Sequence, residues 1–195
     1  SKWKNKGDDR MKKIMIIGAG GIGSFLIPLL SKVGKNRYSI TVYDPDIVEE
    51  KNLTYQNFRR KEIGDNKALC MERRYTVAGL PYKVLSGQQL EGYDLVVCCA
   101  DNLDVRRTMY NSDVRWLDLR AQGRNGLLIS SDEDSKMYPT LTSGPEGNFS
   151  CQGDHWDRSL SGVHFTHVAV AGYGAEWIQR HFNDEETHKH IHVRA

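Results

Sequence analysis

The chain's first candidate chemistry is a glycine turn, Gly18 to Gly23, followed at a distance by Asp44. The turn reads G-A-G-G-I-G and comes directly after a run of apolar residues. Glycines let a backbone turn tightly and approach a phosphate, while a helix N-terminus offers free N–H groups and a partial positive charge. Asp44 lies 21 residues after Gly23, where a carboxylate can accept hydrogen bonds from both hydroxyls of a ribose. Gly18, Gly20, Gly21 and Gly23 are therefore candidate nucleotide contacts.

The elements that would position these residues follow in a suitable order. Ile14 to Ile17 is apolar and mostly β-branched, which indicates a strand buried on both faces. Residues 24–32 are expected to form a helix, and residues 39–43 a second strand that ends at Asp44. This succession favours a nucleotide site over a purely structural turn, with an NAD site as another alternative. Asp44 and the nearby Asp46 could also be ordinary turn acids.

Length and composition indicate one soluble α/β domain. The chain has 195 residues, of which 39% are hydrophobic and 27% charged, and this length suits a single domain of that class. A net charge of +2 gives no electrostatic argument for nucleic acid or an anionic membrane as partner. No apolar stretch approaches the ~20 residues of a membrane span, and residues 1–10 do not read as a signal peptide.

Four cysteines without disulfide-framework spacing point to reduced thiols and a cytoplasmic location. Cys98 and Cys99 lie in an apolar run and are expected in the core. Cys151 lies in an irregular segment, where it could be a nucleophile, a sulfur carrier or a remnant zinc ligand. An ordinary loop thiol is the favoured interpretation.

The remaining pattern predicts a Rossmann-like, doubly wound and mainly parallel sheet with helices on both faces. Helices are expected over residues 66–78 (ended by Gly79), 105–111 and 164–182, and strands over 82–85, 93–100, 115–120 and 126–130. The strand 126–130 is expected to be antiparallel, because no helix separates it from the strand before it. The whole chain, 1–195, is one domain with a polar lead-in (1–12), an irregular crossover-type loop (131–161) and a charged tail (183–195), frayed or a final strand.

Three further motifs follow the glycine turn. They are D-P-D-I-V-E-E-K-N-L-T-Y-Q from Asp44 to Gln56, I-G-D-N-K ending at Lys67, and an apolar strand ending in Asp101-Asn102. Together with the turn they resemble the ThiF/MoeB family, enzymes that adenylate the C-termini of ubiquitin-like and sulfur-carrier proteins. The resemblance covers about residues 13–122 well and the C-terminal helix loosely. It implies the doubly wound fold, with ATP and Mg²⁺ as cofactors.

The resemblance also implies roles for the matched acids and amides. Asp44 would hold the ribose of ATP, with Asp46 beside it in the D-x-D motif. Asn52 and Gln56 would lie near the triphosphate as polar donors that fix its path.

Two charged residues complete the implied site. Lys67 would neutralise the phosphates as a point charge, although a solvated helix lysine is an alternative. Asp101 would bind Mg²⁺, which takes oxygen ligands and few protein carboxylates, although an aspartate here could instead cap the next helix.

Such a site promotes attack of a peptide carboxylate on the α-phosphorus, with position and charge neutralisation supplying most of the rate. The family's motif arginine is Tyr55 here. Arg59 or Arg60, or an arginine from a second subunit, could supply the cation, so a homodimer or a complex with a partner subunit is expected. The predicted catalytic set is Lys67, Asp101, Gln56 and Arg59.

Zinc is not expected, because Cys151 is the one sulfur where relatives often carry two C-x-x-C pairs, and no family catalytic cysteine is evident. The histidines could hold a metal, although solvated side chains are the simpler interpretation; they are His181, His188, His190 and His192.

The leading hypothesis is ATP- and Mg²⁺-dependent adenylation of the C-terminal carboxylate of a small ubiquitin-like or sulfur-carrier protein or peptide. The alternatives are a catalytically silent nucleotide-binding scaffold or regulatory subunit, and an NAD-dependent oxidoreductase. Neither a nucleic acid nor a membrane is an expected partner.

Overall fold

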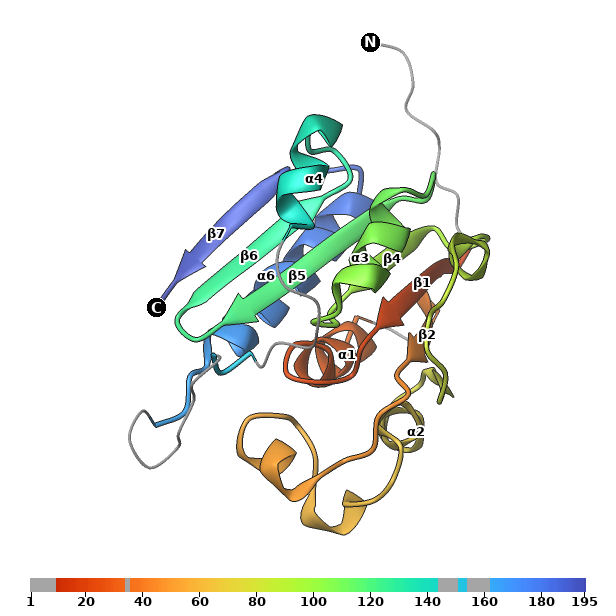
Figure 1. Ribbon diagram of the computed structural model, residues 1–195. Coiled ribbons are helices and arrows are strands. Elements are labelled where there is room, and N and C mark those ends of the chain that lie inside the picture. Colours follow the sequence, from red (N-terminus) through yellow and green to blue (C-terminus); the bar gives the residue numbers. More distant parts are fainter. Residues whose placement is uncertain (1–9, 34–35, 144–150, 154–161) are drawn as a thin grey trace.

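One mixed sheet runs through the molecule and carries the functional edge. The computed structural model describes residues 10–33, 36–143, 151–153 and 162–195. The strands are β1 (Lys12–Ile17), β2 (Tyr38–Tyr43), β3 (Ala78–Leu80), β4 (Leu95–Cys98), β5 (Trp116–Gln122), β6 (Asn125–Ser130) and β7 (His190–Arg194). Their order in the sheet is β3-β2-β1-β4-β5-β6-β7 (Figure 1). The first five are parallel, whereas β6 and β7 pair antiparallel, which confirms the predicted doubly wound sheet with antiparallel strands towards its C-terminal end.

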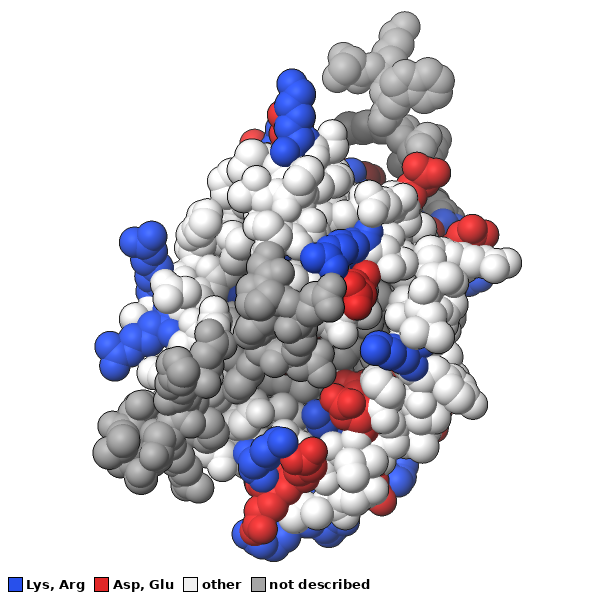
Figure 2. Space-filling model, viewed as in Figure 1, with Lys and Arg blue, Asp and Glu red and all other residues white. Residues whose placement is uncertain are grey.

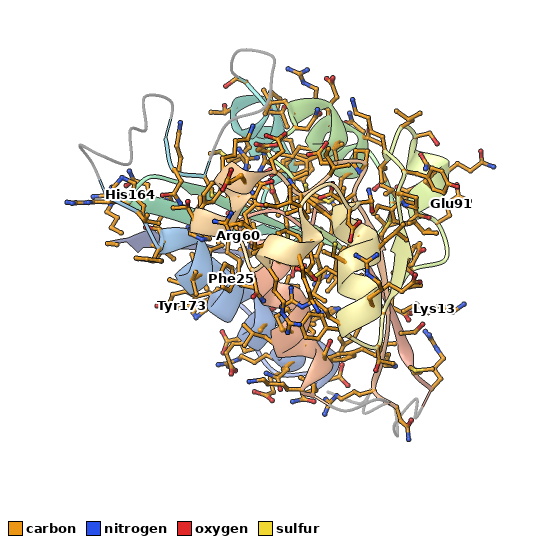
Figure 3. The ribbon with its side chains drawn as sticks, turned by 90° about the horizontal axis from the view of Figure 1, so that it is seen from below. Lys13, Phe25, Arg60, Glu91, His164 and Tyr173 are labelled. Atoms are coloured by element: carbon orange, nitrogen blue, oxygen red, sulfur yellow. The ribbon has the colours of Figure 1, made fainter. Side chains whose placement is uncertain are left out.

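Helices cover both faces of this sheet. The α-helices are α1 (Gly23–Ser31), α2 (Lys67–Arg74), α3 (Leu103–Tyr110), α4 (Tyr138–Leu141) and α6 (Thr166–Phe182), with short 3₁₀ turns η1 (Glu50–Thr54), η2 (Arg60–Glu62), η3 (Gly87–Leu90) and η4 (Ser135–Met137). α1 and α6 pack side by side beneath the sheet in the view of Figure 3, where Phe25 and Tyr173 mark them. None of the helices within the described ranges is long and apolar enough to cross a membrane.

β1 shows why its sequence is uniformly apolar. Ile14 and Ile16 belong to the core under α1 and α6, whereas Met15 and Ile17 belong to the core under α3. The strand is therefore buried on both faces, as its sequence predicts. Chain connections leave β1 in one direction towards β2 and β3 and return to β4 on its other side. Ligands of such sheets bind at the carboxyl edge near this reversal.

Two sequence-based predictions around β3 are wrong. The helix predicted to run to residue 78 ends at Arg74, and residues 82–85 form no strand. The strand forms earlier because Ala78 to Leu80 pair in register with the end of β2. Gly79 is not a helix cap: a Cβ there would lie 2.4 Å from the carbonyl oxygen of Ala68, so glycine allows α2 to pack closely on β3.

The described residues of the C-terminal third contain more regular secondary structure than their composition suggests. Within the irregular loop predicted over 131–161, the described residues form η4 and α4. The charged tail forms β7, whose register on β6 runs from Asn125 opposite Arg194 to Ile129 opposite His190, so the final-strand alternative is correct. Residues 1–9 of the predicted lead-in, and residues 144–150 and 154–161 of the loop, lie outside the described residues.

Candidate functional site

A cavity of about 730 Å³ opens at the carboxyl edge of the sheet. It extends from the glycine turn after β1 to the strands β5, β6 and β7. The predicted site residues on its wall are Gly18, Gly20, Gly21, Asp44, Asp46, Gln56, Lys67, Asp101 and Cys151. The structure therefore brings together residues more than 130 positions apart in the chain.

The glycine turn is shaped by two close backbone approaches. Gly18 has φ +95°, and a Cβ there would lie 2.9 Å from the backbone nitrogen of Ala100. A Cβ on Gly23 would lie 1.9 Å from the carbonyl oxygen of Gly18. Gly23 does not line the cavity, so among the predicted glycine contacts it serves the turn itself. The three other glycines face the ligand space.

Asp44 is buried at the end of β2 and is tied to the glycine turn. Its Oδ2 accepts the backbone N–H of Ala19 at 2.6 Å, and its Oδ1 accepts the backbone N–H of Asp46 at 2.8 Å. Burial raises the pKa of this carboxyl, against the opposing effects of the Ala19 N–H and of Lys67. Each carboxylate oxygen has a second lone pair, so two hydroxyl groups can still be bound.

Lys67 is buried at the first turn of α2. Asn66 caps this helix by accepting the N–H of Leu69 at 3.1 Å, and its Nδ2 donates to the carbonyl oxygen of Asp44 at 2.8 Å. This places Lys67 Nζ 3.8 Å from Asp46 Oδ2, with the side chain 9% exposed. The alternative of a solvated helix lysine does not fit that burial.

The two amides of the N-L-x-x-Q motif have different positions. Gln56 lines the cavity with its Nε2 beside Gly20, and its Oε1 has no hydrogen-bond partner among the described residues. Asn52 is buried away from the cavity wall. Its Oδ1 accepts the N–H of Glu49 at 2.8 Å, so Asn52 shapes the loop that presents Gln56.

Asp101 opens into the cavity just beyond β4. It is exposed, yet enough protein surrounds its carboxyl to raise its pKa. The capping role belongs to its neighbour Asn102, whose Oδ1 accepts the N–H groups of Asp104 at 2.9 Å and Val105 at 3.2 Å. This leaves Asp101 available to a ligand.

The arginines predicted to replace the motif cation lie elsewhere. Tyr55 lines the cavity, but Arg59 is exposed and is not on its wall. Arg60 is exposed and pairs with Glu50 at 3.0 Å. The structure therefore does not bring Arg59 together with the other predicted catalytic residues.

Cys151 lies against the glycine turn, where a Cβ on Gly21 would lie 2.6 Å from its Sγ. Burial raises the pKa of this thiol to about 11, so it is protonated at neutral pH. Of the histidines, His192 lines the cavity and His190 contacts Glu133. The described residues contain no group of three His, Cys, Asp or Glu side chains that could hold a metal ion.

A charged group on the cavity wall, formed by Arg106, Asp118 and Arg120, was not predicted from the sequence. Asp118 is fully buried between the two arginines, both of which line the cavity. The signal was present in the strand itself, because Asp118 and Arg120 are charged at alternate positions of an otherwise apolar run and must share one face.

Comparison with known proteins identifies the class that this fold and site define. Residues 5–115 match the ThiF family, and the chain belongs to that family. The Nedd8-activating enzyme E1 catalytic subunit of Drosophila melanogaster is 31% identical over 153 residues, which are 69% of this chain and 30% of that protein. The sulfur carrier protein adenylyltransferase of Thermus thermophilus is 32% identical over 114 residues, which are 52% of this chain and 41% of that protein.

Among solved structures, that of E. coli MccB with ATP has a TM-score of 0.70 at 15% identity and covers 96% of this chain and 61% of that chain. At this identity the likeness shows the fold. The chain spans less than half the length of the two curated relatives described above.

Proposed function

We propose that this protein binds ATP with Mg²⁺ and adenylates the C-terminal carboxylate of a small ubiquitin-like or sulfur-carrier protein or peptide. The observation that carries the proposal is the convergence of Asp44, Lys67 and Asp101 with the glycine turn on one cavity. Family membership and the relatives described above support the same reaction class.

The residues present suit the nucleotide. Asp44 accepts the ribose hydroxyls with its remaining lone pairs, and the cavity-facing glycines admit the phosphates close to the backbone. Lys67 neutralises phosphate charge, and the side-chain amide N–H₂ of Gln56, which lines the cavity, can donate a hydrogen bond to a phosphate oxygen. A carboxylate of the second substrate attacks the α-phosphorus; the bond from that phosphorus to the bridging oxygen breaks, giving an acyl-adenylate and pyrophosphate.

The residues also suit a magnesium ion. Mg²⁺ is usually held by one or two carboxylates together with substrate phosphates and waters, and Asp101 presents an accessible carboxylate at the cavity with no ion pair to a described lysine or arginine. The ion, when bound with the nucleotide, would neutralise charge on the leaving pyrophosphate.

A nucleotide-binding scaffold without catalysis is the second candidate. It is favoured by Tyr55, which occupies the position of the motif arginine, and by Arg59, which lies off the cavity wall. A homodimer or a partner subunit that supplies an arginine stays a prediction. Light scattering tests the homodimer by measuring the mass of the purified protein in solution.

ATP–pyrophosphate exchange separates the two candidates. The assay follows labelled pyrophosphate into ATP in the presence of Mg²⁺ and a panel of small ubiquitin-like or sulfur-carrier proteins or peptides with free C-termini. Exchange that depends on a free C-terminus and disappears in Asp101→Ala supports adenylation. ATP binding without exchange across the panel supports the scaffold, and binding of NAD in place of ATP contradicts both.

A further inference from the structure

A connected polar network joins β5 to α3 at the cavity wall. The buried carboxylate of Asp118 accepts hydrogen bonds from Arg106 Nε at 3.1 Å, from the hydroxyl of Tyr110 at 2.6 Å and from Arg120 Nε at 2.9 Å. Arg120 Nη2 also donates to the Tyr110 oxygen at 2.9 Å. The Tyr110 ring stacks on Trp116 with centroids 4.2 Å apart. Packing and hydrogen bonds therefore fix both guanidinium groups.

This network carries more positive than negative charge. Two guanidinium groups share the single carboxylate of Asp118, and Tyr110 is neutral because burial and Asp118 raise its pKa. Burial raises the pKa of Asp101 and the charge of Arg106 opposes that rise, but Asp101 forms no ion pair with either arginine in the described part of the chain. One positive charge is left without a paired carboxylate.

The excess charge faces ligand space. Arg106 and Arg120 both line the cavity, with side chains 8% and 23% exposed. On the outer face seen in Figure 2, acidic and basic side chains are interspersed. A partly buried guanidinium that is held rigid and only partly neutralised is well suited to bind an oxyanion through charge-assisted hydrogen bonds.

We propose that Arg120, held in position by Asp118, binds an oxyanion of the reactants: a phosphate group of the nucleotide or the carboxylate of the second substrate. The assignment rests on the proposed function of the same cavity. It supplies that cavity with a guanidinium group, whereas the position of the family's motif arginine is occupied by Tyr55. Arg106 neutralises Asp118, and Asp118 and Tyr110 act as positioning residues for Arg120.

Direct binding tests this assignment without depending on turnover. The probes are inorganic pyrophosphate, AMP and N-acetylglycine, titrated into the full chain while the ¹⁵N resonance of the Arg120 Nε–Hε group is followed by NMR. Movement with pyrophosphate or AMP identifies a phosphate as the ligand, and movement with N-acetylglycine alone identifies the carboxylate. Either result supports the proposal, whereas an Arg120 resonance that moves with none of the probes overturns it.

Three variants test whether the NMR signal of Arg120 reflects a contribution of this residue to the affinity for the probe. Arg120→Ala should weaken binding of the active probe about 10- to 100-fold, as expected for a charge-assisted hydrogen bond, and added guanidinium should restore part of it. Arg120→Lys keeps the charge and should retain part of the affinity. Arg124→Ala removes an exposed cation outside the cavity and should change binding less than about twofold.

The outcomes separate this inference from the proposed function. Arg120→Ala is expected to fold, because Arg106 still neutralises Asp118. Wild-type oxyanion binding that needs Arg120, without any pyrophosphate exchange, keeps the inference and rejects adenylation. Exchange that proceeds equally in wild type and Arg120→Ala, with unchanged probe affinity, rejects the inference and keeps adenylation.

Discussion

The Oδ2 atom of Asp44 lies 2.6 Å from the backbone nitrogen of Ala19, which ties the end of β2 to the glycine turn after β1. The same carboxylate accepts the N–H of Asp46. The acid and the turn are therefore held together before any ligand arrives, so a nucleotide does not have to order them. This preorganisation leads to the first prediction.

Replacing Asp44 with alanine should lower the affinity for ATP and for AMP by about 10- to 100-fold, because charge-assisted hydrogen bonds to the ribose are lost. Isothermal titration calorimetry at pH 7 measures both constants. Asp65→Ala is the matched control, because Asp65 pairs with Arg73 and lies off the cavity wall. Unchanged affinity for both nucleotides in Asp44→Ala would rule out the ribose role.

Acidification should affect ligand binding and folding in opposite directions at Asp44. Burial raises the pKa of this carboxyl above its ordinary 3.8. Nucleotide affinity should therefore fall as pH drops through the raised pKa, because the protonated acid accepts fewer hydrogen bonds. In the free protein, the stability contributed by this group is fully present below its unfolded pKa and is lost as pH rises through the folded pKa. Calorimetric titrations and urea unfolding across this acidic range, with Asp44→Ala as reference, measure the two trends.

The glycine turn predicts contrasting effects for two alanine substitutions. Gly23→Ala would place a Cβ 1.9 Å from the carbonyl oxygen of Gly18, whereas in Gly20→Ala the nearest atom is Gln56 Nε2 at 3.6 Å. We expect Gly23→Ala to lower the free energy of unfolding by about 2 to 3 kcal/mol or more, as severe overpacking does. Gly20→Ala should fold normally and lose only ligand affinity. Urea unfolding and ATP titration of the two variants measure this; equal stability losses would contradict it.

Asp118 predicts an acid-sensitive contribution to stability. Burial alone would raise the pKa of Asp118, but Arg106 and Arg120 hold it below its ordinary value. Its stabilisation is therefore present above the unfolded pKa and is lost as pH falls through the lower folded pKa. Asp118→Asn should cost about 3 to 5 kcal/mol at pH 7, because it leaves buried cations without their carboxylate.

The control for that variant is Asp132→Asn. Asp132 pairs with Arg115 at a more exposed site, with side chains 34% and 37% exposed, so its loss should cost ~0–1 kcal/mol. Urea unfolding of both variants at pH 7, repeated at acidic pH, compares the two pairs. Equal losses would show that burial of the Asp118 network contributes nothing beyond a surface pair.

Cys151 should react slowly with alkylating reagents. Because burial raises its pKa from the ordinary thiol value of 9.0 to about 11, its thiolate fraction at neutral pH is about a hundredfold below that of an unperturbed thiol. Mass spectrometry of the peptide containing Cys151, sampled during iodoacetamide treatment alongside glutathione, gives the relative rate. Modification as fast as that of glutathione would indicate an activated thiol and return Cys151 to the nucleophile candidates.

The sequence predicted the elements near the glycine turn well because local patterns define them. Ile14 to Ile17, the turn and Asp44 follow one another closely in the chain. The apolar composition of β1 already predicts a buried strand, and its pairing with neighbouring strands agrees with that prediction. Gly79 shows where this reasoning fails. Its role depends on the carbonyl oxygen of Ala68, which belongs to a helix packed closely against it. The sequence alone does not show this contact, and a glycine at the end of a helical pattern equally well indicates a helix cap.

The site shows the same limit. Asp44 and Lys67 could be placed because their motifs are short-range, whereas the exposed position of Arg59 depends on the path of a whole loop. Asp118 and Arg120 were visible as alternating charges in an apolar strand, but their meaning depends on Arg106 and Tyr110 from α3. Contacts between residues far apart in the chain, and not local propensity, determine where Arg59, Asp118 and Arg120 lie.

The cavity wall divides at the boundary between β4 and β5. The family match ends at residue 115, and the wall beyond it comes mostly from β5, β6 and β7, including Arg120 and His192, with Ser143 and Cys151 beside them. Substitutions in these three strands can change the charge and shape of one wall while the glycine turn, Asp44 and Lys67 keep their contacts. One end of the cavity can therefore stay fixed for a common ligand while the other is refitted to different ones.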